Sequence, residues 1–181
     1  MDVISTSLDG VWKIPLRRAH DERGWFRRTF DAQAFRALGL VTEWAAEAEA
    51  FNARAGTLRG LHLQREPHAE TKLIRCTHGA AYDVLLDARP GSRTFGRWEA
   101  FELHEEDETA LYAPGGIAHG YQTLRDQTLL HYLLSAPYAA EAAAGFRYDS
   151  PSLAIPWPLA VSTVSERDRA LPPFALSGVD T

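Results

Sequence analysis

The amino-acid sequence predicts an all-β fold, a sandwich or barrel of short strands with short helices near its ends. Apolar or alternating runs of about four to eight residues recur roughly every ten residues, separated by glycine, proline and aspartate. Helical periodicity is scarce and confined to a few short segments. Neither a long-period repeat nor a low-complexity segment interrupts the chain.

The predicted strands share apolar, β-branched or aromatic residues bounded by turn-forming residues. They cover residues 11–16, 25–30, 57–64, 72–77, 80–87, 98–103, 109–113, 121–124 and 128–135. Gly79 alone separates two of these strands. Pro90 and Gly91 predict a turn between two others.

Helices are expected only as small additions to this β body. Asp31 is predicted to cap a short helix that includes Phe35 and Leu38 and ends at Gly39. Residues 139–144 predict one turn near a late strand, and residues 165–171 predict another turn of helix before a Pro-Pro pair.

Length and charge limit the class of protein. A chain of 181 residues with 45% hydrophobic residues predicts one domain, residues 1–181, large enough to fold without disulfides or a structural metal. The formal net charge of -5 disfavours nucleic acid and anionic membranes as partners.

Cys76 is the only cysteine, which excludes an intramolecular disulfide, and its strand-like setting predicts a small buried apolar residue. The N-terminal residues lack the basic and apolar regions of a signal peptide. The longest uncharged stretch, residues 150–165, contains three prolines and is unsuited to a membrane-spanning helix. We therefore expect a cytoplasmic soluble protein.

The segment 57–64 contains the densest group of candidate site residues. As a regular strand it would place Arg59, Leu61 and Leu63 on one face, and Leu58, Gly60, His62 and Gln64 on the other. Gly60 would then leave room for a ligand beside His62. A buried, hydrogen-bonded core histidine is the alternative interpretation.

Three further segments are candidates, although each alone has an ordinary structural explanation. Residues 114–120 predict a tight Pro-Gly turn that leads to His119 at the start of a strand. Tyr132 lies in an apolar strand, where tyrosine is most often a core aromatic. Residues 165–168, which end in Asp168, are typical of a solvated helix start.

Taken together, these motifs resemble a known family. They are Asp21-Glu-Arg-Gly-Trp-Phe26, Leu58-Arg-Gly-Leu-His62 with Gln64, Lys72-Leu, Tyr82-Asp-Val84, Pro114-Gly-Gly-Ile-Ala-His-Gly120, Tyr132, Tyr138, Asp149-Ser-Pro151, Ile155-Pro-Trp-Pro158 and Ser165-Glu-Arg-Asp168. Their order resembles that of the dTDP-4-dehydrorhamnose 3,5-epimerase family over residues 11–174. The resemblance implies a cupin jelly roll, usually a homodimer.

The resemblance also implies an isomerase that uses neither metal nor cofactor and acts on a nucleotide-diphosphate-linked 4-keto-6-deoxy sugar. The C4 ketone of such a sugar acidifies the protons at C3 and C5, so inversion needs a base, an enolate stabiliser and an acid on the opposite face. His62 matches the family's base, and Asp168 matches the carboxylate that orients it. Tyr132 matches the acid, and Lys72 matches the cation near the enolate oxygen.

Other residues match positions that bind the substrate. Arg23 and Arg59 match residues that meet the diphosphate, for which guanidinium is a suitable donor. His119 and Asp83 match pocket positions. The substrate-binding set also includes Phe26, Gln64 and Tyr138.

The chain departs from the family pattern on the nucleotide side. Arg28 stands where a carboxylate is common, and Leu63 stands where an aromatic is common. The stretch before Gly56, where Gln, Asn and Ser are common, reads Ala48-Glu-Ala-Phe-Asn-Ala-Arg-Ala55. Because of these departures, an alternative stays open: an epimerase that inverts a single carbon of another nucleotide sugar.

Two alternative hypotheses assign the chain to other classes of protein. A metal-dependent cupin would use His62, Gln64, Glu70 and His119, although an amide oxygen is a poor ligand for a transition metal. A non-catalytic sugar-nucleotide-binding cupin would keep the pocket but would have no need of a base that faces an acid.

Overall fold

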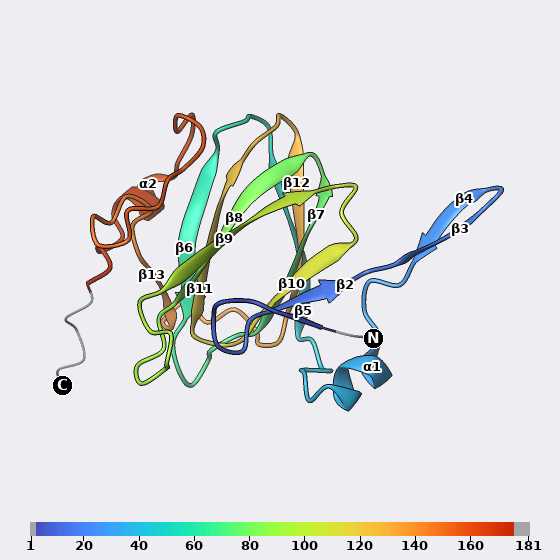
Figure 1. Cartoon of the computed structure of the whole chain (residues 1–181). Helices are drawn as coiled ribbons and strands as arrows, with labels where there is room; N and C mark the ends of the chain where they lie inside the picture. Colours follow the sequence, from blue (N-terminus) through green and yellow to red (C-terminus); the bar gives the residue numbers. More distant parts are fainter. Residues whose placement is uncertain (1–2, 176–181) are drawn as a thin grey trace.

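Two antiparallel sheets face each other in the computed structural model of the chain, which describes residues 3–175 (Figure 1). The six-stranded sheet has the order β1 (Ile4–Ser5), β2 (Trp12–Pro15), β10 (Thr109–Ala113), β7 (Lys72–His78), β12 (Thr128–Leu134) and β5 (Ala46–Asn52). The five-stranded sheet has the order β13 (Ala143–Gly145), β6 (Leu58–Gln64), β11 (Ile117–Thr123), β8 (Ala80–Asp87) and β9 (Trp98–His104). The all-β prediction is confirmed.

The main core fills the space between these sheets. Ile74 and Leu130 from the six-stranded sheet and Leu85 and Leu103 from the five-stranded sheet belong to this core. Cys76 is also buried there, with 4% of its surface exposed, as the sequence predicted. Burial raises the pKa of its thiol to about 12, so Cys76 stays protonated and is a poor nucleophile.

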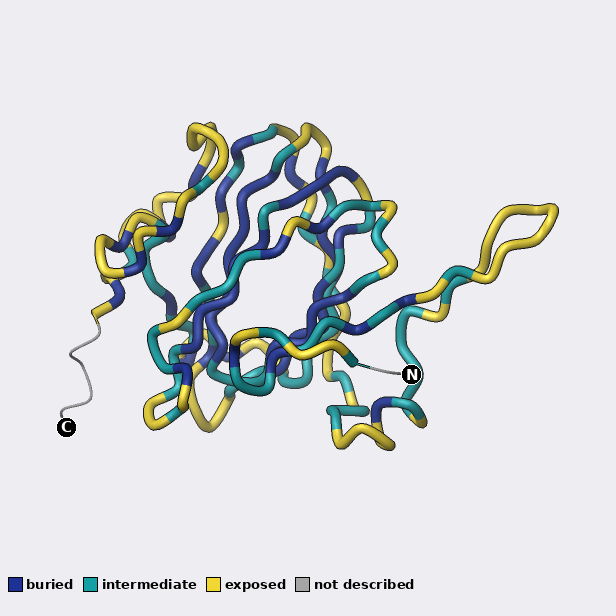
Figure 2. Tube along the Cα trace, viewed as in Figure 1, coloured by how far each residue is buried: buried dark blue, intermediate teal, exposed yellow. Residues whose placement is uncertain are grey.

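Each sheet also packs on its outer face. Leu153, Ile155 and Phe174, which follow the last strand, cover the outer face of the five-stranded sheet. Phe35 of α1 (Ala32–Ala37) packs with Ile14 and Tyr112 against the six-stranded sheet. Most of the body is accordingly buried or half-buried in Figure 2.

The short helix α1 forms as predicted. The Asp31 carboxylate accepts hydrogen bonds from the N–H groups of Gln33 and Ala34, which have no partner within the helix. The helix stops at Leu38, and Gly39 adopts a positive φ of 70°. The helical turn predicted over residues 165–171 is also present, as α2 (Glu166–Arg169).

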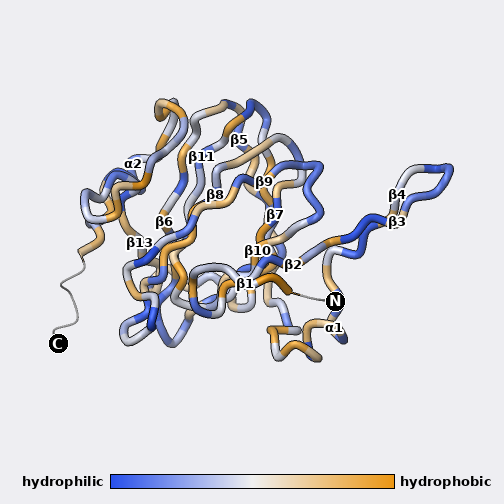
Figure 3. Tube along the Cα trace, viewed as in Figure 1, coloured by the Kyte–Doolittle hydropathy of each residue, from blue (hydrophilic) through white to orange (hydrophobic). Residues whose placement is uncertain are grey.

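An exposed hairpin projects from the body and consists of β3 (Arg18–Asp21) and β4 (Gly24–Arg27) (Figure 1). The predicted strand 25–30 therefore ends early, and its partner β3 was not predicted. The guanidinium groups of Arg18 and Arg27 lie 4.5 and 5.1 Å from the Trp25 ring. The hairpin is among the most hydrophilic parts of the trace in Figure 3.

For three other strands, β5, β11 and β13, the prediction was wrong or incomplete. β5 was missed because alanine and glutamate have low strand propensity, and its pairing with β12 fixes it instead. β11 begins at Ile117, where its ladder with β8 starts, and not at Tyr121. A turn does form at Ala139, whose C=O accepts from the N–H of Ala143, but β13 then begins within the predicted turn. In residues 3–175, no helix is long and apolar enough to cross a membrane.

Asp87 organises the turn between β8 and β9. It is fully buried, and its carboxylate accepts hydrogen bonds from Arg89, Ser92 and Thr94 at distances of 2.5 to 3.0 Å. Burial alone would raise the pKa of Asp87, but these hydrogen bonds outweigh it and lower the pKa to about 2. The carboxylate therefore contributes stability above pH 3.8, and that stability is lost as pH falls through about 2.

We predict that Asp87→Asn lowers the free energy of unfolding at neutral pH by about 2 kcal/mol, because an amide cannot accept all of these bonds. Urea titrations at about pH 7, 4 and 3 check this, and the difference from the wild type should narrow at the lowest pH. Asp9→Asn is the matched control, since Asp9 pairs with Arg93 at the exposed surface. Equal losses in the two variants at neutral pH would contradict the prediction.

Candidate active site

A bulge in β6 brings Arg59 and His62 to the same side of the sheet. In the ladder with β11, His62 pairs with His119 and Arg59 pairs with Tyr121, so three steps on β6 match two on β11. The extra residue resets the alternation, and Arg59 lines the same cavity as His62. The prediction that Arg59 shares a face with Leu61 was therefore wrong.

Gly60 serves strand packing rather than ligand access. A Cβ atom at this position would lie 2.5 Å from the Gly120 Cα and 2.7 Å from the His119 carbonyl oxygen. Gly60 also adopts a φ of 111°, which side-chain-bearing residues rarely adopt. The space that the sequence assigned to a ligand is filled by the β11 backbone.

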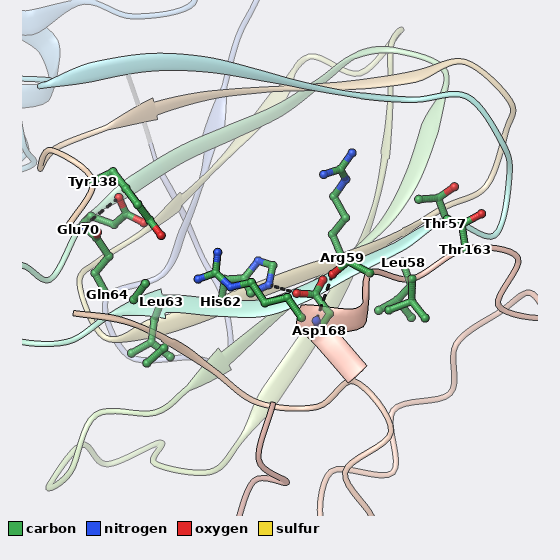
Figure 4. Close-up of a pocket in the computed structure, with 15 residues that line it drawn as sticks. Thr57, Leu58, Arg59, His62, Leu63, Gln64, Glu70, Tyr138, Thr163 and Asp168 are labelled. Carbon is green, nitrogen blue, oxygen red and sulfur yellow. Dashed lines mark hydrogen bonds and ion pairs between the residues drawn. The ribbon is translucent and has the colours of Figure 1, made fainter. Parts of the chain in front are cut away.

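His62 and Asp168 form a close pair (Figure 4). The His62 Nε2 lies 2.7 Å from the Asp168 Oδ1, and Asp168 Oδ2 accepts the Gly60 N–H at 3.1 Å. Burial raises the pKa of Asp168, but the hydrogen bond and charge of His62 and the hydrogen bonds from Gly60 and Ser165 together outweigh it, so the net pKa is below the usual value. An ionised carboxylate only accepts hydrogen bonds, so Nε2 carries the His62 proton and Nδ1 is the free, basic nitrogen.

The C-terminal segment is bonded along β6, which places Asp168 beside His62. The N–H of Leu58 donates to the Thr163 carbonyl at 2.8 Å, and the N–H of Ser162 donates to the Gly56 carbonyl at 2.9 Å. Ser165 then caps α2 by accepting the Asp168 N–H. The sequence motif 165–168 is thus both a helix start and part of the site.

Lys72 lines the same cavity as Arg59 and His62, and 8% of its side chain is exposed. Its Nζ donates to the His62 carbonyl oxygen at 3.2 Å and lies 3.4 Å from Oε1 of Glu70. Burial lowers the pKa of Lys72, and the charges of Glu70 and Asp83 oppose that shift.

Tyr132 on β12 faces the same cavity as a neutral phenol. Burial raises its pKa well above the usual value, and neighbouring Tyr121 and Asp83 add to this shift. Tyr121 exchanges hydrogen bonds with the side chain of Asn52 at 3.1 and 3.3 Å. The two tyrosines therefore hold their protons at neutral pH and are available as donors.

A second histidine–carboxylate pair lies behind the first. The His119 Nε2 is 2.7 Å from Oδ2 of Asp83, and both side chains are buried. The His119 ring stacks on Tyr121 and meets the edge of Tyr132, with centroid separations of 5.9 and 5.7 Å. Among the described atoms, Asp83 Oδ1 has no hydrogen-bond partner.

Arg59 is held from the edge of the six-stranded sheet. Its Nε donates to Oδ1 of Asn52 at 2.9 Å, and its Nη2 donates to the Phe51 carbonyl at 3.3 Å. Asn52 was not singled out from the sequence. The alternation of alanine with polar residues before it was the available signal for a strand that ends at the cavity.

Two adjoining hollows form the cavity, with volumes of about 430 and 260 Å³. Arg59, His62 and Glu70 line both of them. Asp168 lines the larger hollow, and Lys72, His119 and Tyr132 line the smaller. The four predicted catalytic residues thus surround one continuous site.

Gln64 and Tyr138 lie at the other end of the larger hollow (Figure 4). The Gln64 amide donates to the carbonyls of His68 and Pro137, and its oxygen accepts the Ala139 N–H at 2.6 Å. Gln64 therefore ties together two loops. Tyr138 is 69% exposed beside them.

Arg23 and Phe26 are not brought to this cavity within one chain. Both lie on the projecting hairpin, where Phe26 is 67% exposed and the Arg23 guanidinium pairs with Asp21 at 2.6 Å. Arg28 lies just beyond this hairpin and pairs with Asp31.

The residues that a metal-dependent cupin would use as ligands have other partners here. Gln64 is bonded to backbone atoms, and Glu70 faces Lys72. Within residues 3–175, no group of three or more His, Cys, Asp or Glu side chains is placed to hold a metal ion.

Comparisons with known proteins agree on one family. A sequence model of dTDP-4-dehydrorhamnose 3,5-epimerase matches residues 5–175. A Sinorhizobium fredii protein described as dTDP-4-dehydrorhamnose 3,5-epimerase is 40% identical over 169 residues, which are 93% of this chain and 87% of the relative.

Two solved structures have the same fold. The Bacillus anthracis dTDP-4-dehydrorhamnose 3,5-epimerase with TDP and PPi bound has a TM-score of 0.92 and 35% identity, covering 96% of this chain and 99% of its own. The Legionella pneumophila dTDP-6-deoxy-D-glucose-3,5-epimerase in complex with dTDP-4-keto-L-rhamnose has a TM-score of 0.87 and 31% identity, covering 96% and 98%.

Proposed function

The chain belongs to the dTDP-4-dehydrorhamnose 3,5-epimerase family, and we propose that its His62–Asp168 pair carries out the proton abstraction of that family's reaction. The protein is an epimerase that acts on a dTDP-sugar, with dTDP-4-keto-6-deoxy sugar 3,5-epimerase activity. The observation that carries the proposal is the geometry of the pair, because it leaves Nδ1 of His62 unprotonated beside the cavity.

His62 Nδ1 removes a proton from the carbon next to the C4 ketone, and the electron pair moves to the ketone oxygen to form an enolate. The resulting imidazolium is stabilised by the Asp168 carboxylate, whose lowered pKa keeps it charged. The Lys72 ammonium, placed in the same hollow, offsets the negative charge on the enolate oxygen.

Tyr132 returns a proton to the opposite face of the same carbon. Its raised pKa keeps the phenol protonated until its proton is transferred to the carbon atom of the enolate. The phenolate formed is next to Tyr121 and Arg59, which can restore the proton and balance the charge. His62, whose side chain is 40% exposed, then releases its proton to solvent, and solvent resupplies the proton of the tyrosine pair. The same steps, repeated at C3 and at C5, invert both carbons.

The diphosphate is assigned to Arg59, whose guanidinium is held at the junction of the two hollows. Tyr138, exposed at the rim, is assigned to the nucleoside, since an exposed aromatic ring offers a stacking surface.

We also propose that the protein works as a two-fold homodimer in which each hairpin completes the partner's cavity. Arg23 and Phe26 match substrate-binding positions yet are exposed and distant from the cavity of their own chain. Trp25 on the same hairpin is 51% exposed, and Phe51 on the edge strand β5 is 57% exposed. Reciprocal exchange of the hairpins would cover these apolar surfaces.

We predict that His62→Asn lowers turnover by ~100-fold or more, because asparagine cannot accept the substrate proton at neutral pH. NMR detection of deuterium incorporation at C3 and C5 of dTDP-4-keto-6-deoxyglucose measures both positions. Thermal unfolding close to that of the wild type is the control for an intact fold. Turnover within about threefold of the wild type would exclude His62 as the base.

Tyr132→Phe should separate abstraction from inversion. With the base intact, the substrate should gain deuterium from solvent with its configuration retained, while epimer formation falls by ~100-fold or more. A purely structural Tyr132 predicts near-normal inversion and a loss of about 1 kcal/mol of stability from one hydrogen bond. NMR of the sugar, which reads exchange and configuration together, distinguishes these outcomes.

Mixing two impaired variants should restore activity if the hairpin acts in the partner. An Arg23→Ala chain supplies an intact His62, and a His62→Asn chain supplies an intact hairpin. After subunit exchange, about a quarter of all cavities should hold both intact parts, by random pairing of the two chains. Absence of recovery in a sample whose mixed dimers are demonstrated by mass spectrometry would place the hairpin's action within its own chain.

A further inference from the structure

Glu70 has no part in the mechanism above, although it lines both hollows of the cavity. It lies two residues before Lys72, on the segment that leads into β7. Its Oε1 is 3.4 Å from the Lys72 Nζ, and its Oε2 is 3.5 Å from Nε2 of Gln64. Its side chain is 12% exposed, so the carboxylate and the ammonium are both largely removed from solvent.

The buried Lys72 ammonium needs a negatively charged neighbour to stay protonated, because removing an ammonium from water favours the neutral amine. Groups facing its cavity come from several elements. They are Arg59 and His62 on β6, Asp83 on β8, His119 and Tyr121 on β11, Tyr132 on β12, and Glu70 on the preceding segment.

Among these groups, Asp83 is already bonded to His119. Arg59 adds a positive charge to the hollow, and the two tyrosines hold their protons. Within residues 3–175, Glu70 is the only carboxylate that forms an ion pair with Lys72. The site therefore depends on one side chain to offset the cost of its buried cation.

We infer that Glu70 is the positioning residue of Lys72, holding the ammonium charged and directed at the position of the enolate oxygen. This inference rests on the proposed function, in which Lys72 stabilises the enolate. A neutral amine would supply only a hydrogen bond, whereas the ammonium supplies a full charge in a poorly hydrated cavity. Glu70 thereby extends the alkaline range over which the enzyme works.

The chain offers a direct measurement, because Lys13 and Lys72 are its only lysines. Protein labelled with carbon-13 lysine gives two Cε signals, which Lys13→Arg assigns. In Glu70→Gln, we expect the titration midpoint of Lys72 to fall by about one pH unit or more, a tenfold change in its protonation equilibrium. The midpoint of Lys13 should stay unchanged and also reports an intact fold.

Glu141→Gln is the matched control, since Glu141 lies three residues after Tyr138, which lines the larger hollow, but pairs with His68. It should leave the Lys72 midpoint in place. If Glu70→Gln fails to fold, Glu70→Asp supplies the test, with a smaller shift in the same direction. A Lys72 midpoint within about 0.3 pH unit of the wild type in the folded variant would overturn the inference.

The pH dependence of kcat then tests whether catalysis uses the charge on Lys72. In Glu70→Gln, kcat should match the wild type best near neutral pH and fall by ~10-fold or more on the alkaline side, with KM little changed. A shifted Lys72 midpoint with an unshifted alkaline limb would overturn the role of Lys72 as a charged stabiliser. Neither result alters the His62→Asn test, so failure here is distinguishable from failure of the proposed base.

Discussion

The Asp168 carboxylate joins two parts of the chain that are 106 residues apart, and the candidate chemistry depends on it. One oxygen accepts the proton of His62, and the other accepts the Gly60 N–H at the bulge of β6. The first bond fixes which imidazole nitrogen is basic, and the second fixes where the helix end sits on the sheet. Without this anchor His62 would be a half-exposed histidine with no preferred orientation.

Patterns that are local in the sequence predicted local structure well. Apolar runs found most strands of both sheets, and Asp31 marked the start of α1. β5 could not be found in this way, because its alanines and glutamates become a strand only through the ladder with β12. Its end carries Asn52, so the side chain that holds Arg59 was missed with it.

The site shows the same contrast between what the sequence predicts and what only the pairing of strands determines. The family resemblance predicted one site for His62, Lys72, Tyr132 and Asp168, and the fold brings them around one cavity. The side of the sheet that Arg59 occupies depends on a bulge between β6 and β11, where the backbones of Gly60 and Gly120 approach closely. No single-strand alternation contains that information, because the register belongs to the pair.

The last described helix has a consequence for how the enzyme is made. Synthesis proceeds from the N-terminus, so the strands of both sheets leave the ribosome before α2 does. A nascent chain that stops short of residue 168 can pair most of its strands but has no carboxylate for His62. Catalytic competence therefore requires that synthesis has passed residue 168, later than every strand of the two sheets that support the site.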